Sequence, residues 1–274
     1  MNKAAIPPDT DLRAGQEAVR GSLFVANLSG GKDSQAMLLR MLKIVPRGQI
    51  LAIHAHLGEV AWPGTLEHAQ QHAQHAGVAF LVARAQKTLL EMVETRFATR
   101  PEVPSWPSPQ FRQCTSDLKR GPLNREIRRY AKAQGYTRVI NCTGIRREES
   151  PQRSKLGPWR RQESECSKTR EWLEWLPIFE LSTQDVWTLL RESNQTAHPA
   201  YAQGNTRMSC VFCLMGSEGD LRNGARLNPE LFEKYAALED KTGYTLSPNG
   251  KTLRQRLSHL SHPAPITRGD LDAL

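Results

Sequence analysis

The feature that most constrains this sequence is a glycine-rich loop between a short apolar run and a stretch with helical spacing. Residues 22–28 have the apolar density of a buried strand, and the apolar residues between Ala36 and Leu42 recur with the period of a helix. Residues 29–34, which lie between them, read Ser-Gly-Gly-Lys-Asp-Ser. Glycines let backbone N–H groups turn inward, and a helix N-terminus adds positive potential. The sequence therefore predicts a binding loop for phosphate groups.

The polar residues of this loop suit the same ligand. Lys32 can neutralise a phosphate oxygen, and Ser29 and Ser34 can donate hydrogen bonds to one. Asp33 can help to hold a magnesium ion. The spacing is not that of the Walker loop, in which four residues separate the two glycines. An incidental glycine turn is the alternative, and the strand–loop–helix context argues against it.

The alternation of strand and helix continues along the chain. Further strands are expected over 49–55, 78–83 and 138–143, and further helices over 65–76, 86–97 and 229–242. Another helix is expected over 185–190, with Ser182 or Thr183 as its cap. This order predicts an α/β fold in which a parallel twisted sheet has helices on both faces and binds ligands at the carboxyl ends of its strands.

Three parts are expected along the chain: a polar leader over 1–20, a nucleotide-binding α/β domain over 21–200, and a small cysteine-bearing lobe over 201–274. Two segments interrupt the rhythm. Residues 100–109 contain four prolines and predict an irregular loop or lid. Residues 146–171 are charged and weakly apolar, so they are expected to be mobile.

The positive charge is local. The net charge of the chain is +9, and residues 119–170 contain fifteen Lys or Arg against five Asp or Glu. A local positive field suits a polyanion such as nucleotide phosphates, sulfate or a nucleic-acid backbone, and a solvated basic face is the alternative. The first twenty residues are polar and no run reaches membrane-spanning length, so a soluble, cytoplasmic protein with no membrane partner is expected.

The five cysteines are expected to be reduced thiols, which makes metal ligation or catalysis a better reading than a disulfide framework. Cys210 and Cys213 form a Cys-x-x-Cys pair, which alone is moderate evidence for a metal. Cys142 lies in an apolar run and is interpreted as a small buried residue.

Several segments together resemble a known superfamily. The loop over 29–34 looks like the pyrophosphate-binding motif of N-type ATP pyrophosphatases, and the rest of the chain resembles the phosphoadenosine-phosphosulfate reductase superfamily, which has an adenine nucleotide alpha hydrolase-like, Rossmann-type fold. The resemblance spans about Ser22 to Asn228. The segments that carry it are Leu57-Gly58, 62–65, 114–119 with Pro122, 144–150 with Arg153, Pro177 with 185–187, and 198–201 running into 210–213.

The resemblance assigns roles to individual residues. The arginines of its Gly-x-Arg motif clamp phosphate or sulfate, and Arg146 and Arg153 match them. The residues implied in binding ATP with Mg²⁺ are Ser29, Gly30, Gly31, Lys32, Asp33, Ser34, Gly144 and Lys119. Those implied in catalysis are Lys32, Asp33, Arg146 and Arg153. Family members often have an aspartate after the second strand, where this chain has His56, and the role of His56 is left open.

The resemblance also bears on the chemistry. Sulfonucleotide reductases of the superfamily carry a degenerate loop and a nucleophilic cysteine in a Glu-Cys-Gly segment, whereas this loop is intact and no cysteine follows Cys213. The chain is closer to the ATP sulfurylase small subunits and the sulfur-incorporating proteins of DNA phosphorothioation. That branch implies adenylylation of an acceptor, with loss of pyrophosphate, for sulfur transfer. Reduction of an adenylyl sulfate by a thiol supplied in trans and a non-catalytic nucleotide-binding regulator are the alternatives.

The segment around Cys114 resembles the one that supplies cluster cysteines in iron–sulfur members. Cys114, Cys210 and Cys213 are therefore expected to hold one metal centre. Whether Cys166 or Cys142 supplies a fourth ligand is left open, and if neither does, one iron is open to bind a sulfide. Zinc and unligated thiols are the alternatives to an iron–sulfur cluster. The expected partners are an adenine nucleotide, a sulfur-donor protein and a nucleic acid that the basic stretch guides. DNA, RNA, a small molecule and sulfate all stay open as acceptors.

Overall fold

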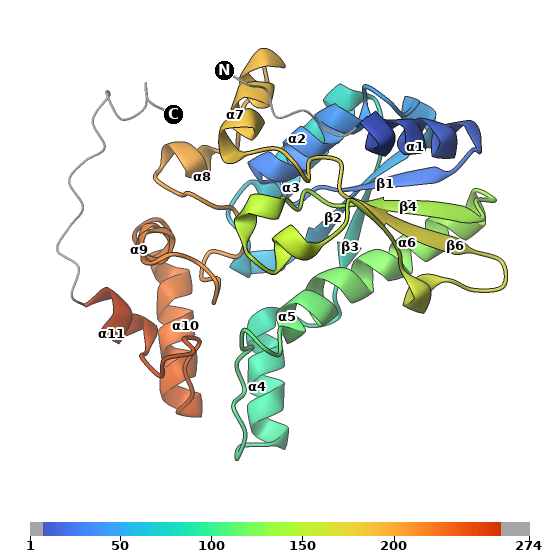
Figure 1. Cartoon of the computed structure of the whole chain (residues 1–274). Helices are drawn as coiled ribbons and strands as arrows, with labels where there is room; N and C mark the ends of the chain where they lie inside the picture. The colour runs from blue at the N-terminus through green and yellow to red at the C-terminus, as the bar shows by residue number, and fades with distance from the viewer. Residues whose placement is uncertain (1–7, 259–274) are drawn as a thin grey trace. The chain divides into compact units, whose positions relative to one another are not determined.

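The computed structural model describes residues 8–258, which form two compact units (Figure 1). The first unit comprises residues 8–54, 64–83 and 123–198, and the second comprises 55–63, 84–122 and 199–258. The predicted small lobe begins at residue 201, whereas the second unit also takes in the two earlier segments. Sequence periodicity reports local elements, so it could not show that three distant segments share one core.

The first unit is built on a six-stranded sheet in the order β3-β2-β1-β4-β6-β5. β1 pairs in parallel with β2 and with β4, β4 pairs in parallel with β6, and β5 is antiparallel to β6. The strands are β1 (Leu23–Asn27), β2 (Ile50–His56), β3 (Ala79–Arg84), β4 (Arg138–Cys142), β5 (Trp159–Arg161) and β6 (Glu171–Trp175). This mostly parallel sheet confirms the predicted fold class.

Helices cover both faces of the sheet, as predicted, because successive side chains of a strand point to opposite faces. Phe24 and Ala26 of β1 belong to a core with α1, α2, α3 and α7, whereas Leu23 and Val25 pack with Ile127 of α6. The bounds are α1 (Pro8–Val19), α2 (Lys32–Met41), α3 (Thr65–Ala76), α6 (Gly121–Ala133) and α7 (Thr183–Glu192). The Ser182 side chain accepts from the Asp185 N–H and caps α7, which confirms one of the two predicted caps.

Part of the predicted polar leader is the helix α1. Its Glu17 is 3% exposed, accepts a hydrogen bond from Ser22 and pairs with Arg138 of β4. Burial opposes the charge of Glu17, but the hydrogen bonds from Arg138 and Ser22 leave its pKa below the usual value. The amphipathic α1 is thus tied to the sheet by a buried charge, a contact that its polar composition concealed.

The segment 146–171 was expected to be mobile, and this was wrong in part. It contains β5, which pairs with β6, and short 3-10 turns. Charged side chains stabilise it, because Arg160 pairs with Glu174 across the two strands. The short turns of the chain are 3-10 turns at Arg47–Gln49, Gly58–Val60, Arg147–Glu149, Arg153–Lys155 and Glu163–Glu165, and a π-type turn at Ser116–Arg120.

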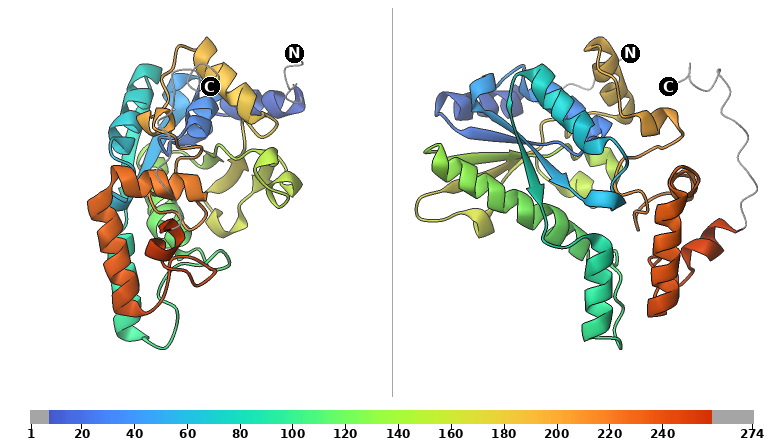
Figure 2. Two further views of the ribbon diagram at one scale, coloured as in Figure 1. Left: turned by 90° about the vertical axis from the view of Figure 1, so that its left-hand side faces the viewer. Right: turned by 180° about the vertical axis from the view of Figure 1, so that it is seen from behind.

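The second unit is helical (Figure 2). It has its own hydrophobic core, which includes Trp62, Trp106, Phe212 and Tyr235. The segments at its centre are joined by an antiparallel bridge between Ala61 and Cys210. Its helices are α4 (Leu89–Thr99), α5 (Gln113–Thr115), α8 (Pro199–Ala202), α9 (Glu218–Leu227), α10 (Pro229–Thr242) and α11 (Leu253–Leu257). None of the helices in the part of the chain described here has the length and hydrophobicity that a membrane crossing requires.

Candidate functional site

Residues 29–34, the predicted binding loop for phosphate and from here on the phosphate loop, follow β1 at the point where the strand order reverses. β1 lies between β2 and β4, and the chain builds the sheet outward to β3 on one side and to β6 on the other. In open parallel sheets this point leaves a crevice at the carboxyl ends of the two central strands, where ligands bind. The loops after β1 and β4 are therefore the ones that can form a site together.

Gly30 gives the loop a shape that no other residue allows without strain. Its φ is +80°, and a Cβ at this position would lie 2.7 Å from Cγ2 of Thr65, the first residue of α3. Gly31 follows in extended conformation as the N-cap of α2, and no side chain caps that helix. The first turn of α2 therefore presents backbone N–H groups and positive potential where a phosphate is predicted to bind.

The two serines of the loop bond to each other and to the loop backbone. The Ser34 hydroxyl donates to the Gly31 carbonyl oxygen at 2.8 Å and accepts from the Ser29 N–H at 3.2 Å. The Ser29 and Ser34 Oγ atoms are 3.3 Å apart. Ser34 is 5% exposed, so its hydroxyl holds the shape of the loop, while the exposed Ser29 remains accessible from solvent.

Asp33 joins the two cations predicted to act on the phosphates. Lys32 Nζ lies 3.1 Å from one carboxylate oxygen of Asp33, and Arg146 Nε lies 2.8 Å from the other. Arg146 is 4% exposed and also pairs with Glu148. Burial opposes its charge, but Asp33 and Glu148 raise the pKa of Arg146 above the usual value. Arg146 therefore stays charged near the first turn of α2.

Gly144 places the loop after β4 against that turn. A Cβ at Gly144 would lie 2.8 Å from the carbonyl oxygen of Asp33, so a side chain would push the two loops apart. Arg153, the second predicted clamp, pairs with Glu149, and Glu149 also accepts from the backbone N–H of Arg146 at 2.8 Å. The structure thus brings together the predicted residues of the first unit.

Lys119, predicted to bind the same nucleotide, belongs to the second unit, where it lies near the cysteines. Cys114, Cys210 and Cys213 are close enough for their charges to interact. Burial is the main cause that raises the pKa of Cys114 and of Cys210, and the Lys119 cation lowers both in part. The fully buried Tyr235 hydroxyl faces the same thiols, and burial holds its pKa well above the usual value.

This cluster does not have the geometry of a metal centre. Within residues 8–258, no group of three or more His, Cys, Asp or Glu side chains is arranged so that it could hold a metal ion. The two cysteines considered for a fourth ligand lie in the first unit. Cys142 is buried in β4, as predicted, and Cys166 Sγ accepts from the Trp172 N–H at 3.3 Å. The donor set therefore does not fit a cluster or a zinc ion in this arrangement.

The basic stretch forms a groove along α6. A cavity of about 490 Å³ is lined by five cations, and ion pairs partly offset them, with Arg128 bound to Glu165 and Arg129 to Glu126. No carboxylate lines the groove itself. The cations are Arg125, Arg128, Arg129, Lys132 and Arg170.

Three histidines of the first unit form a cluster that the sequence did not predict. His68, His72 and His75 lie along one side of α3, a spacing that by itself favours an exposed histidine face, but His68 and His72 are half-buried and only His75 of the three is exposed. His72 Nε2 lies 3.0 Å from His68 Nε2, and its Nδ1 lies 2.9 Å from Gln195 Oε1. The buried His198 ring packs on His68 at 5.3 Å. The four-residue spacing of His68 and His72 was a visible signal, but the contact with His198 was not. His56, whose role was left open, ends β2.

Parts of this chain are similar in sequence to known proteins. An uncharacterized protein of Methanocaldococcus jannaschii is 24% identical over 80% of the chain and 48% of its own length, and a second one from that organism is 25% identical over 80% and 42%. The chain thus spans about half of these relatives. An uncharacterized 37.8 kDa protein of Escherichia phage 186 is 26% identical over 80% of the chain and 75% of its own length.

Solved structures resemble it more loosely. Phosphoadenylyl-sulfate reductase of Candida auris, solved with phosphate, has a TM-score of 0.46 at 14% identity and covers 76% of this chain and 98% of its own. Candida glabrata FMN adenylyltransferase, solved with ATP, has a TM-score of 0.40 at 16% identity over 76% of this chain and 65% of its own.

The family comparison is specific. The model of the phosphoadenosine phosphosulfate reductase domain matches residues 24–215, which is more than half of the chain and includes the phosphate loop, Gly144, Arg146 and all five cysteines. The chain belongs to the phosphoadenosine phosphosulfate reductase domain family.

Proposed function

We propose that this protein binds ATP on the loop over 29–34 and activates an acceptor by adenylylation, with release of pyrophosphate, for sulfur transfer. One observation carries the proposal: an intact loop after β1 places Lys32 and Arg146 on the same carboxylate at the start of α2. Two buried cations beside a helix N-terminus are suited to a triphosphate. Membership in the family supports an adenine nucleotide as the ligand.

The reaction needs little from the protein beyond position and charge. An acceptor oxygen attacks the α-phosphorus, the bond from that phosphorus to the bridging oxygen breaks, and pyrophosphate leaves with the electron pair. A sulfur nucleophile then attacks the activated acceptor and AMP departs. The loop N–H groups, Lys32 and Arg146 would hold the phosphates in line and neutralise the charge that develops on the leaving group.

The ion pairs of Asp33 restrict how its carboxylate could bind a magnesium ion. Both of its carboxylate oxygens accept from cations, one from Lys32 and one from Arg146. For Asp33 to ligate Mg²⁺, as the sequence suggested, one of these cations must move onto the phosphates. ATP binding supplies the anionic oxygens that such an exchange requires, so the ion pairs keep Lys32 and Arg146 in place for the nucleotide.

The alternative is reduction of an adenylyl sulfate by a thiol supplied in trans, and the description of the matching family favours it. The two functions differ in the nucleotide that binds best. If the proposal is right, calorimetric titration finds tighter binding of MgATP than of phosphoadenylyl sulfate. Tighter binding of the sulfonucleotide would support the reductase function instead.

Lys32→Ala is expected to weaken MgATP binding about 10-fold or more, since a charge-assisted contact with phosphate is lost. Lys43→Ala is the matched control, because Lys43 is exposed just beyond α2. Thermal unfolding of both variants separates lost binding from lost stability. Equal ATP affinity in the two variants would contradict the placement of the triphosphate on this loop.

The proposal gives the cysteine cluster no step in the reaction, because its thiols do not converge on a metal position. The expected iron–sulfur cluster, with zinc as its alternative, stays a prediction. Metal and sulfide analysis of anaerobically purified protein tests it, together with the ultraviolet–visible spectrum. If these cysteines do hold a metal, each of Cys114→Ser, Cys210→Ser and Cys213→Ser loses it and Cys166→Ser keeps it. Full iron and sulfide content in the Cys114→Ser protein would refute the ligand assignment.

A further inference from the structure

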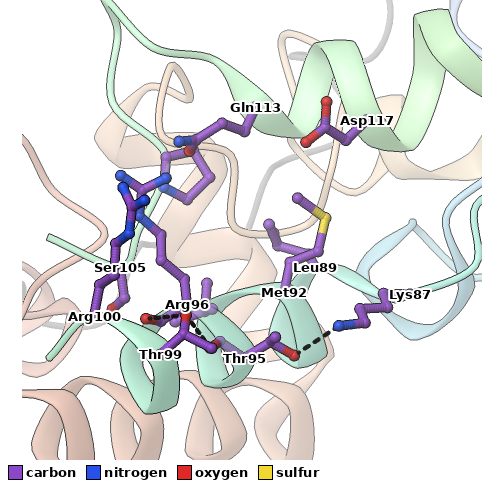
Figure 3. Close-up of a pocket in the computed structure, with 12 residues that line it drawn as sticks. Lys87, Leu89, Met92, Thr95, Arg96, Thr99, Arg100, Ser105, Gln113 and Asp117 are labelled. Carbon is purple, nitrogen blue, oxygen red and sulfur yellow. Dashed lines mark hydrogen bonds between the residues drawn. The ribbon is translucent and has the colours of Figure 1, made fainter. Parts of the chain in front are cut away.

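A second cavity lies within the second unit and uses none of the residues of the phosphate loop. Its volume is about 270 Å³. One wall is the face of α4 that carries Leu89, Met92, Val93 and Arg96, which recur three and four residues apart. The proline-containing segment 100–109 and the residues from Gln113 to Asp117 form the other walls (Figure 3).

Two polar atoms of this cavity lack hydrogen-bond partners. Ser105, on the irregular segment, is 3% exposed and lines the cavity, and its Oγ has no partner among the described residues. The buried Nε of Arg96 is in the same state within residues 8–258. A buried donor without a partner costs about 1–3 kcal/mol, and these two donors belong to one site. A hydrogen-bond acceptor bound in the cavity would lie beside both of these side chains.

The charge of the cavity indicates the kind of acceptor. Lys87, Arg96 and Arg100 line it against a single carboxylate, that of Asp117. Arg100 caps the C-terminus of α4, four residues after Arg96, and Figure 3 shows both side chains extending toward Gln113. Like charges at this spacing repel each other, and an oxyanion between the two guanidinium groups would remove the repulsion. Lys87 donates to Thr95 at 3.1 Å and lies at the other end of the cavity.

The rest of the lining is apolar. Leu89, Met92 and Val93 from α4 and the buried Pro107 offer a surface for carbon atoms beside the cationic end. A volume of about 270 Å³ is close to the lower end of ligand pockets. A molecule with a single ring fits such a volume better than a complete nucleotide.

We propose that this cavity binds a small organic anion. Its carboxylate or phosphate group is held by Arg96 and Arg100, with Ser105 donating to it, and its apolar body packs on Leu89, Met92 and Pro107. Because the cavity and the phosphate loop share no residue, this site does not depend on the proposed adenylylation. It adds a second small-molecule ligand to the adenine nucleotide that the sequence predicts.

Four probes separate the parts of the proposal. Phenyl phosphate and benzoate carry both an oxyanion and a ring, benzyl alcohol carries only the ring, and inorganic phosphate carries only the anion. In ligand-observed NMR titrations of the full chain, we expect the two aryl anions to bind at least about 10-fold more tightly than the other two probes. Equal affinity of benzyl alcohol and phenyl phosphate would overturn the assignment of an anion site.

Variants locate the binding. Arg96→Gln should weaken phenyl phosphate about 10-fold or more and Ser105→Ala a few-fold, because each removes a donor from the oxyanion. Arg254→Gln is the control, since it removes a guanidinium of the same unit that pairs with Glu233 on the surface. Circular dichroism checks that the variants fold. Met92→Trp, which fills the cavity, should block benzoate without removing a charge.

The phosphate loop could itself take up phenyl phosphate, so the titration is repeated in Lys32→Ala. Binding that survives Lys32→Ala and falls with Arg96→Gln supports the cavity. Binding that is lost with Lys32→Ala and unchanged by Arg96→Gln would overturn it while leaving the nucleotide proposal intact. Loss of MgATP binding in Lys32→Ala with unchanged phenyl phosphate binding would likewise separate the two sites.

Discussion

The contacts of Asp33 in the structure differ from the role that the sequence suggests for it. As part of a Gly-Gly-Lys-Asp run it suggests a magnesium ligand, and in the structure it pairs with Lys32 and Arg146. Arg146 is more than a hundred residues away along the chain, and the close contact of Gly144 with the Asp33 carbonyl brings it there. The ion pair follows from strand order, which no local pattern contains.

The histidine cluster gives a prediction of pH dependence. Burial, followed by the nearby His72 and His198, lowers the pKa of His68 to about 4 from an ordinary value of 6.5. Between these two pH values, His68 is protonated in the unfolded chain and neutral in the folded protein. The free energy of unfolding is therefore at its full value above pH 6.5. It falls as the pH drops from there toward about 4, by an amount on the order of 1–3 kcal/mol.

Urea unfolding at a series of pH values measures this effect. The slope between pH 6.5 and 4 should be shallower in His68→Gln, which has no proton to take up. His75→Gln is the matched control, because His75 is exposed on the same helix. An unchanged pH profile in the His68→Gln protein would show that the acid sensitivity lies elsewhere.

At the level of elements, part of the positive charge of residues 119–170 forms one basic surface along α6. Three- and four-residue spacing places Arg125, Arg128, Arg129 and Lys132 along one groove. Arg170 joins them from the turn before β6. Glu126 and Glu165 neutralise part of the charge. Within residues 8–258, neither Lys132 nor Arg170 pairs with a carboxylate, so the groove keeps a net positive charge that suits an anionic backbone.

We predict that this groove binds nucleic acid by its phosphates. Affinity for duplex DNA or transfer RNA should fall steeply as salt rises, with a slope set by the number of phosphates contacted. Mobility-shift assays at several salt concentrations measure the slope. The double variant Arg129→Gln with Lys132→Gln should reduce it by about 2, whereas Arg254→Gln with Lys251→Gln should not.

Phosphate contacts carry little sequence preference, so specificity would come from the pocket or from a partner protein. Absence of any shift at low salt, with DNA and RNA alike, would leave a small molecule or sulfate as the acceptor. The sulfur-donor protein expected from the sequence stays a prediction, and capture of a defined cysteine desulfurase by the purified chain would test it.

At the scale of the whole molecule, each unit has its own core. Phe212 is 1% exposed and packs with Phe232 and Tyr235 in the second unit. Phe212→Ala should lower the free energy of unfolding of the second unit by about 3–5 kcal/mol. Because the phosphate loop packs in the first unit, MgATP affinity under native conditions should be kept. Denaturant unfolding and calorimetry measure the two quantities, and a parallel loss of affinity would contradict independent cores.

Several elements of both units could be predicted from local patterns. The helices over 65–76 and 229–242 have the predicted bounds, since a left-handed glycine ends each of them, at Gly77 and at Gly243. The strands β5 and β6 were missed because short, charged segments carry no periodic signal. Their pairing depends on partners such as Arg160 with Glu174, which become neighbours only in the sheet.

The sequence by itself determined the α/β class and the family and predicted the phosphate loop, because these rest on residues that are contiguous or regularly spaced. The tertiary structure alone decided that Asp33 binds two cations, that the second unit is assembled from three segments, and that Ser105 and Arg96 meet in a cavity. It also decided that the three cysteines gather without a metal geometry. Such features depend on contacts between residues far apart in the chain, and the burial that gives them their energies exists only after folding.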